Sequence, residues 1–189
     1  MSGIRRAAAL AVAVGGGAFL GAAPATASVS PGYIVEHDVK GETTLAAPAA
    51  TAPLTGKLYD KVDLMTGVHT YTLALDETKL SFRWNGDEPA SARLQFATAG
   101  PETGPVGKPG VRMTLAVPDV AVGGASVGGG PDCATAPFSV AFTTAGSSAS
   151  GPYHARFTLP PLTGCGKRTD EISAALTGPG NTMDLTVAN

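Results

Sequence analysis

Two cysteines, Cys133 and Cys165, are the residues whose chemistry has to be placed first. A thiol becomes a nucleophile or a metal ligand when a nearby base or cation lowers its pKa, whereas in an oxidising compartment two thiols form a disulfide. Neither cysteine lies at the start of a predicted helix or in a known catalytic signature, and His154 is the candidate base for Cys165. With no third cysteine to pair with, the sequence predicts a Cys133–Cys165 disulfide rather than a reactive thiol.

The three histidines are His37, His69 and His154, and no two of them have the short spacing of a metal site. His37 beside Asp38, or His69 facing Asp63 across a hairpin, would form an acid–base pair. A single histidine on a strand is more often solvated than catalytic. We therefore expect no metal, no cofactor and no catalytic residue.

The acidic residues do not form the carboxylate pair of a glycosidase. Adjacent acids at 76–77, 87–88 and 170–171 lie at predicted turns, and neighbours within a strand face opposite sides of a sheet. The sequence also lacks a calcium loop, a serine nucleophile elbow, a Walker loop and a dinucleotide fingerprint. The glycines at 123–131 lack the lysine of a phosphate-binding loop, so we interpret them as a linker.

A sugar-binding sheet displays several tryptophans or tyrosines on one face. The chain has one tryptophan and four tyrosines, most of which alternate with polar residues as core positions do. Trp84 lies beside the turn signal Asn85-Gly86-Asp87. A core position is the favoured interpretation for Trp84, and it is also the one aromatic residue that we name as a candidate ligand surface.

Period-two alternation of apolar and polar residues recurs along the chain and predicts strands. Two such runs flank Thr66-Gly67 and predict a hairpin, whose first strand presents Leu58, Val62 and Leu64 on one face. Residues 99–110 are rich in glycine and proline and predict an exposed loop.

The strands number roughly nine or ten, with turn signals about every 8–12 residues, which is typical of an all-β antiparallel β-sandwich. We expect one sandwich domain over residues 28–189 with one disulfide; the alternative is a subdivision near 123–131. A closing hairpin is expected around residues 178–182, although Thr169–Ala174 would also suit a short helical turn capped by Thr169.

The N-terminal segment has the layout of a secretory signal peptide. Two arginines precede an apolar run from Ala7 to Ala23, and the small-residue tripeptide Ala-Thr-Ala follows. These features predict that residues 1–27 are removed by cleavage between Ala27 and Ser28.

Without Arg5 and Arg6 the exported chain has 11 basic and 15 acidic residues, a net charge of −4. This balance argues against nucleic acid as a partner. Beyond the signal peptide no apolar stretch is long enough to form a transmembrane segment. We expect a secreted protein that is extracellular or loosely associated with the cell envelope.

Most of residues 30–189 resembles a group of uncharacterised secreted β-proteins of actinobacteria. The segments that carry the resemblance are LTGKLYDKVDLMTG, DCATAPFSVAF, YHARFTLPPLTGCG and ALTGPGNTMDLTV. Members of the group have two cysteines and a closing hairpin around GPGNT. The resemblance implies export, an all-β fold and the disulfide, and it implies no reaction.

Together these patterns favour an exported, non-enzymatic binding or structural protein whose partner is an envelope polymer, a lipid or another protein. One alternative is a secreted hydrolase whose site is assembled from distant residues, with His154, His37 and one acidic residue as candidates. Another alternative is a carrier that holds a small apolar ligand between its sheets. Its cavity would be lined by residues such as Phe96, Met113, Phe142 and Phe157.

Overall fold

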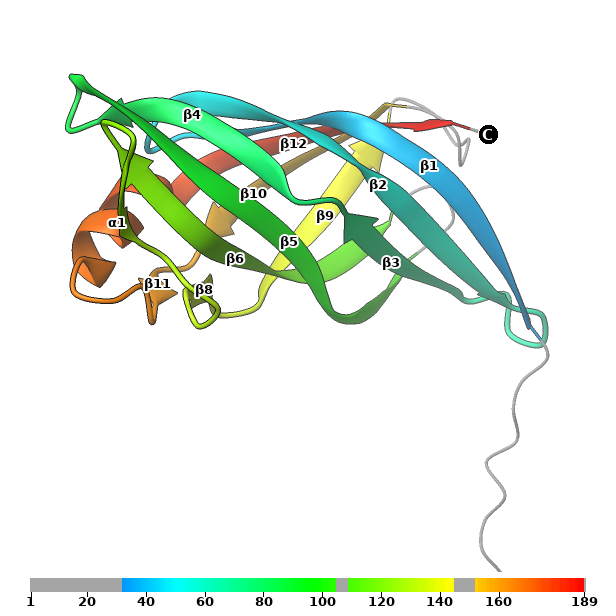
Figure 1. Ribbon diagram of the computed structural model, residues 1–189. Coiled ribbons are helices and arrows are strands. Elements are labelled where there is room, and N and C mark those ends of the chain that lie inside the picture. Colours follow the sequence, from blue (N-terminus) through cyan, green and yellow to red (C-terminus); the bar gives the residue numbers. More distant parts are fainter. Residues whose placement is uncertain (1–31, 105–108, 145–151, 189) are drawn as a thin grey trace, which may run out of the picture.

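A computed structural model describes residues 32–104, 109–144 and 152–188 of the chain. The expected signal peptide, residues 1–27, and its cleavage site between Ala27 and Ser28 lie outside the described residues. Within these ranges the chain forms twelve strands and one short helix (Figure 1). The strands are β1 (Gly32–Leu45), β2 (Ala50–Asp63), β3 (His69–Leu75), β4 (Thr78–Trp84), β5 (Glu88–Gly104), β6 (Gly110–Val122), β7 (Ala125–Gly128), β8 (Ala134–Thr135), β9 (Phe138–Thr144), β10 (Pro152–Leu159), β11 (Leu162–Thr163) and β12 (Gly178–Ala188), and the helix is α1 (Thr169–Leu176).

The strands form one antiparallel sheet that curls until it meets itself. The hydrogen-bonded order runs β6-β9-β10-β12-β1-β2-β3-β5, and β5 then pairs with β6 along most of its length. Figure 1 shows the resulting curled sheet, in which β1 and β2 lie across from β6 and β9. The predicted all-β antiparallel fold with one disulfide is confirmed, with facing walls that share one core as the layers of a sandwich do.

The core follows from the alternation that the sequence displays, because successive side chains of a strand face opposite sides. On β6, Val111, Met113 and Leu115 are completely buried. Arg112, which lies between the first two, is exposed. The glycine-rich segment 123–131 includes β7, which folds back along β6, so it joins strands of the same sheet.

The predicted loop at 99–110 is wrong in its first part. Strand β5 continues to Gly104, where it pairs with His69 at the start of β3. The register against β6 shifts between Thr98 and Gly100, and such an irregularity accommodates glycine and proline in a strand.

The predicted closing hairpin around 178–182 is also wrong. Residues Thr169–Leu176 form α1, whose Ile172 and Leu176 are four residues apart and are both buried against the core. The helix begins after Arg168 and not at a Thr169 cap, since the Thr169 hydroxyl donates to the Gly166 carbonyl oxygen at 2.7 Å. Residues 178–182 instead begin β12, which pairs with β1 and β10. Within the described residues, no helix has the length and apolar character that would be needed to span a membrane.

Strand β1 carries a glycine where it must lie very close to β12. Gly41 pairs with Leu185 on β12 and with Leu54 on β2. A Cβ atom at this position would overlap the carbonyl oxygen of Asp184. The close approach of the two backbones therefore requires glycine.

We expect Gly41→Ala to lower the free energy of unfolding by about 1–3 kcal/mol, because the strands must move apart to admit the methyl group. The matched control is Gly110→Ala, whose added methyl group meets the carboxylate end of the Glu102 side chain at 3.0 Å and no backbone atom. Urea unfolding of both variants checks the prediction. Equal destabilisation by the two substitutions would contradict it.

The predicted Cys133–Cys165 disulfide is confirmed. Cys133 directly precedes β8 and Cys165 follows β11 after one glycine, and the two short strands pair with each other. The Cα atoms of the two cysteines are 4.3 Å apart, and both residues are buried. The Val117 N–H donates to the Cys133 carbonyl oxygen at 2.8 Å, so the cross-link fastens the approach to α1 onto β6. Disulfides of this kind are typical of proteins from oxidising compartments.

Replacing both cysteines with alanine is expected to lower the free energy of unfolding by about 3–4 kcal/mol, because the unfolded chain loses a covalent constraint. A thiol reductant should bring the wild-type protein down to the stability of the variant and leave the variant unchanged. Denaturant unfolding with and without reductant measures both effects. A wild-type unfolding midpoint that does not respond to reduction would refute the prediction.

Candidate functional site

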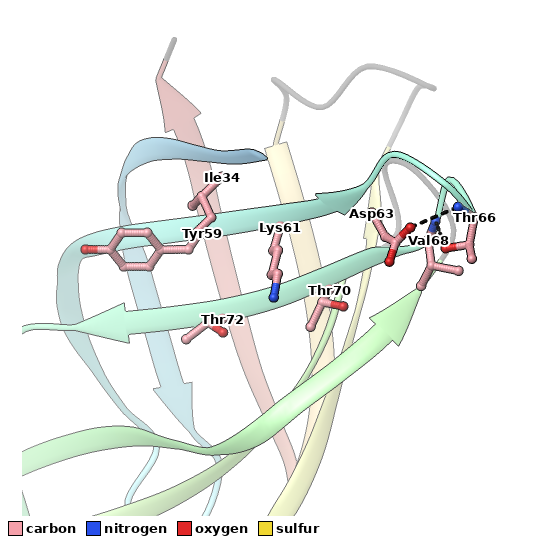
Figure 2. A pocket seen from close by; sticks show the side chains of 8 residues that line it. All are labelled: Ile34, Tyr59, Lys61, Asp63, Thr66, Val68, Thr70 and Thr72. Atoms are coloured by element: carbon pink, nitrogen blue, oxygen red, sulfur yellow. Dashed lines mark hydrogen bonds between the residues drawn. The ribbon is translucent and has the colours of Figure 1, made fainter. Parts of the chain in front are cut away.

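The outer face of the β2–β3 hairpin carries a shallow hollow close to its turn. Lys61 and Asp63 point outward on β2, because Val62 between them enters the core. Thr70 and Thr72 occupy the equivalent outward positions on β3, and Figure 2 shows all four side chains on one side of the hairpin. The hollow has a volume of about 600 Å³. Its lining residues are Ile34, Tyr59, Lys61, Asp63, Thr66, Val68, Thr70 and Thr72.

The turn between β2 and β3, which the sequence predicted, is held together by Asp63. The Asp63 carboxylate accepts hydrogen bonds from the N–H groups of Met65 and Thr66, both at 2.9 Å. Gly67 has a φ of 67°, a conformation that favours glycine, and its N–H donates to the Asp63 carbonyl oxygen at 2.8 Å. The Val68 N–H donates to the Thr66 hydroxyl at 3.3 Å. Each N–H group from Met65 to Val68 therefore has an acceptor inside the turn.

Around this turn lie five large apolar side chains that are exposed to solvent. Met65 is 75% exposed, Ile34 64% and Leu64 61%. Tyr33 and Val68 complete the group, and we call these five residues the hairpin-end surface. In the described part of the chain, no other large apolar side chain is exposed to this degree. Gathered apolar exposure of this kind makes the surface a candidate for contact with a partner.

The first strand contributes to the hairpin-end surface because it begins beside the turn. Gly32 pairs with Asp63, and Tyr33 pairs with Val62, so the start of β1 lies against the end of β2. The next residue, Ile34, faces outward and lines the hollow. The surface is thus assembled from two segments that are about 30 residues apart in sequence.

The sequence predicted that Leu64 shares one strand face with Leu58 and Val62, and this is wrong. Strand β2 ends at Asp63, so Leu64 begins the turn and no longer obeys the alternation. The signal that identifies the surface is local: two adjacent apolar residues, Leu64 and Met65, stand directly before the turn residues Thr66 and Gly67.

The interior near the same end of β2 contains an acid–base pair. Asp60 is buried, and its carboxylate lies 2.8 Å from Nδ1 of His69. The His69 ring stacks on Tyr71 with centroids 6.0 Å apart. The His69–Asp63 pair, which the sequence offered as an alternative to a solvated histidine, does not form, because Asp60 and His69 both turn inward while Asp63 holds the turn. A buried carboxylate requires a partner of this kind, so we interpret the pair as structural.

The second acid–base pair is on the outer face, where Nδ1 of His154 lies 2.6 Å from an Asp184 carboxylate oxygen across β10 and β12. Both side chains are about half exposed, and they border a hollow of about 570 Å³. On β1 the residue opposite Asp184 is Glu42, so His37 does not join this pair. His37 and Asp38 do not meet either, since Asp38 lies 3.6 Å from Lys57 on the outer face. Among the described residues no three His, Cys, Asp or Glu side chains gather at a metal site.

Trp84 belongs to the core, which is the interpretation that the sequence favoured, and the candidate ligand surface that was named for it is wrong. Its side chain is 5% exposed, and its ring centroid lies 6.3 Å from that of Phe82. The alternation of β4 continues to its last residue, so Trp84 turns inward although it stands directly before the Asn85-Gly86-Asp87 turn.

The aromatic residues considered for a carrier cavity pack tightly in the interior. Phe157 stacks on Phe138 with centroids 5.5 Å apart, and Phe142 meets the edge of Tyr153 at 6.2 Å. An apolar gap beside Phe142 has a volume of about 10 Å³. That is about the space of one water molecule and too little for a carried ligand. Phe96 and Met113 are likewise buried.

Tyr153 gives the folded protein a specific response to alkaline pH. Burial raises the pKa of its hydroxyl, and the negative charge of Asp60 raises that pKa further. The unfolded chain therefore releases this proton at a lower pH than the folded protein does. The group leaves stability unchanged below about pH 10 and lowers it as the pH rises above that value.

Substitution Tyr153→Phe should remove this part of the alkaline loss of stability. Denaturant unfolding of the wild type and the variant, at about pH 8 and about pH 11, measures the difference. We expect a smaller fall in the free energy of unfolding for the variant. Falls of equal size in the two proteins would show that Tyr153 plays no part.

The candidate site is thus an exposed apolar surface on an internally bonded turn, beside a shallow hollow that contains one lysine and several threonines. The two acid–base pairs are separate from it, one inside the sheet and one on another part of its outer face. Comparison of the chain with protein-family models, curated proteins and solved structures finds no match, so its function is argued from this surface.

Proposed function

We propose that this protein is exported and acts without catalysis, by binding a component of the cell envelope or its surroundings through the hairpin-end surface. The observation that carries the proposal is the exposure of Ile34, Leu64 and Met65 around one turn. Leaving such side chains in water is unfavourable, and contact with a partner removes them from water.

The construction of the turn supports binding rather than an accidental exposure. Asp63 fixes the backbone of Met65 and Thr66, so the apolar side chains are presented on a preorganised support. A preorganised surface loses little conformational entropy when it binds. The adjoining hollow adds the ammonium group of Lys61 and the hydroxyl groups of Thr70 and Thr72, which suit a polar group next to an apolar one.

A secreted hydrolase remains the second candidate function, and the His154–Asp184 hydrogen bond favours it. The pair borders an open hollow, and an imidazole oriented by a carboxylate is suited to general base catalysis. In the absence of catalysis the same pair serves as a cross-strand link between β10 and β12.

Substitution Met65→Asp tests the proposed function. The exported protein is sedimented with washed envelope material of the cells that produce it, and the bound fraction is compared between variants. We expect the apparent affinity to fall by about tenfold or more, because a carboxylate replaces an apolar side chain at the contact. The matched control is Ala47→Asp, which adds the same charge at the exposed turn at the opposite end of β2.

The histidine variant His154→Ala separates the two candidate functions. A binding protein retains its binding to envelope material in this variant, whereas a hydrolase loses the release of soluble products from the same material. Equal binding by the wild type, Met65→Asp and Ala47→Asp would contradict the proposed function.

A further inference from the structure

We infer that the hairpin-end surface docks on a lipid bilayer, with the turn between β2 and β3 entering the headgroup region. The inference rests on the proposed function and names the partner of the same surface. It is carried by the shape of the surface, the hydrogen bonding of the turn, the position at which the chain enters β1 and the local charge.

The apolar side chains project from the molecule instead of lining a cavity. Leu64 and Met65 stand at the tip of the hairpin, and Figure 1 places the β2–β3 turn at one extreme end of the molecule. The hollow beside them is open, and Figure 2 shows its lining side chains spread along the strands. A small apolar ligand is normally enclosed in a concave site, whereas a protruding apolar tip suits insertion into an extended apolar layer.

The hydrogen bonding of the turn suits an environment that is poor in water. Backbone N–H groups that enter lipid must find acceptors within the protein. Here the N–H groups of Met65 and Thr66 are taken by the Asp63 carboxylate, and those of Gly67 and Val68 by other acceptors of the turn. The tip can therefore leave water while each of these four N–H donors keeps its acceptor.

The chain enters the fold directly beside this tip. Gly32, the first residue of β1, pairs with Asp63 at the end of β2. The apolar run of the predicted signal peptide ends at Ala23, and the stretch from there to Gly32 spans at most roughly 30 Å when fully extended. Before its cleavage, a signal peptide in the membrane would therefore hold the hairpin-end surface within reach of the same bilayer, on which the surface would dock.

The charges near the tip favour contact driven by apolar side chains over attraction to anionic lipid. Lys61 is the cation that lines the hollow, and Asp63 of opposite sign lies two residues further along β2. The exported chain as a whole has a predicted net charge of −4. We therefore expect binding to uncharged bilayers and little dependence on salt, since screening acts on charges and not on apolar contact.

Sedimentation with vesicles of pure dioleoylphosphatidylcholine tests the inference on the exported protein. The wild type should bind at low and high salt. The affinity of the double variant Leu64→Asp/Met65→Asp should be lower by a factor of about ten or more. Ala47→Asp should bind as the wild type does. Unchanged thermal unfolding of the variants shows that the fold is retained, which is expected for substitutions at exposed positions.

A fluorescent probe at the tip gives a second measurement. Both native cysteines are in the disulfide, so Met65→Cys supplies a single thiol for an environment-sensitive dye. We expect a blue shift of the dye on addition of the same vesicles and no shift for a dye at Ala47→Cys. A probe at position 65 that stays in water while the protein is vesicle-bound would overturn the inference.

The remaining outcomes separate this inference from the proposed function. The wild type could fail to bind the vesicles and still sediment with delipidated envelope material, with weaker sedimentation of Met65→Asp. In that case the lipid inference fails and the proposed function stands. Met65-dependent self-association without lipid would identify a second copy of the chain as the partner and would also overturn the lipid inference. If no Met65-dependent binding is found in any of these assays, both fail.

Discussion

The pairing of β5 with β6 is the constraint on which the rest of the structure depends. The ladder runs from Ala90 and Val122 to beyond Gly100 and Arg112, and it joins what would otherwise be two free edges of a long curled sheet. Free edges invite pairing with other chains, and closure removes that hazard along most of the sheet. Closure also sets which residues meet in the interior, because it makes β5 and β6 part of the same core as β1 and β12.

A closed sheet has two ends, and in this protein the two ends differ in which side chains they bury and which they expose. At one end α1 buries Ile172 and Leu176, and the Cys133–Cys165 disulfide ties the neighbouring short strands together. Toward the other end lie the buried Asp60–His69 pair and the projecting turn. The disulfide and the apolar contacts of α1 thus stabilise the end of the sheet that carries the helix. The opposite end presents side chains that a stable core would have enclosed.

The sequence was informative wherever the relevant signal is local. Alternation identified most strands and the core positions of β6, and the disulfide followed from counting cysteines. Period two gives the face of a residue but not the last residue of a strand. Leu64 was therefore grouped with Leu58 and Val62, and Trp84, although favoured for the core, was also named as a candidate surface. The pairing of Asp60 with His69 depends on which strand faces inward at each position, and the closing β5–β6 ladder depends on the whole chain. Such long-range geometry is not contained in any short window of residues.

The position of β12 has a consequence for the export that we propose. This strand lies between β1 and β10, with Lys40 paired to Thr186, so the first and last described strands must find each other. Contacts of such long sequence separation form slowly. A chain that is translocated from its N-terminus cannot complete the sheet until β12 has emerged, and it stays open enough to thread through a channel until then. Both cysteines precede β12, so on the proposed export route they would reach the oxidising side before the final strand is inserted.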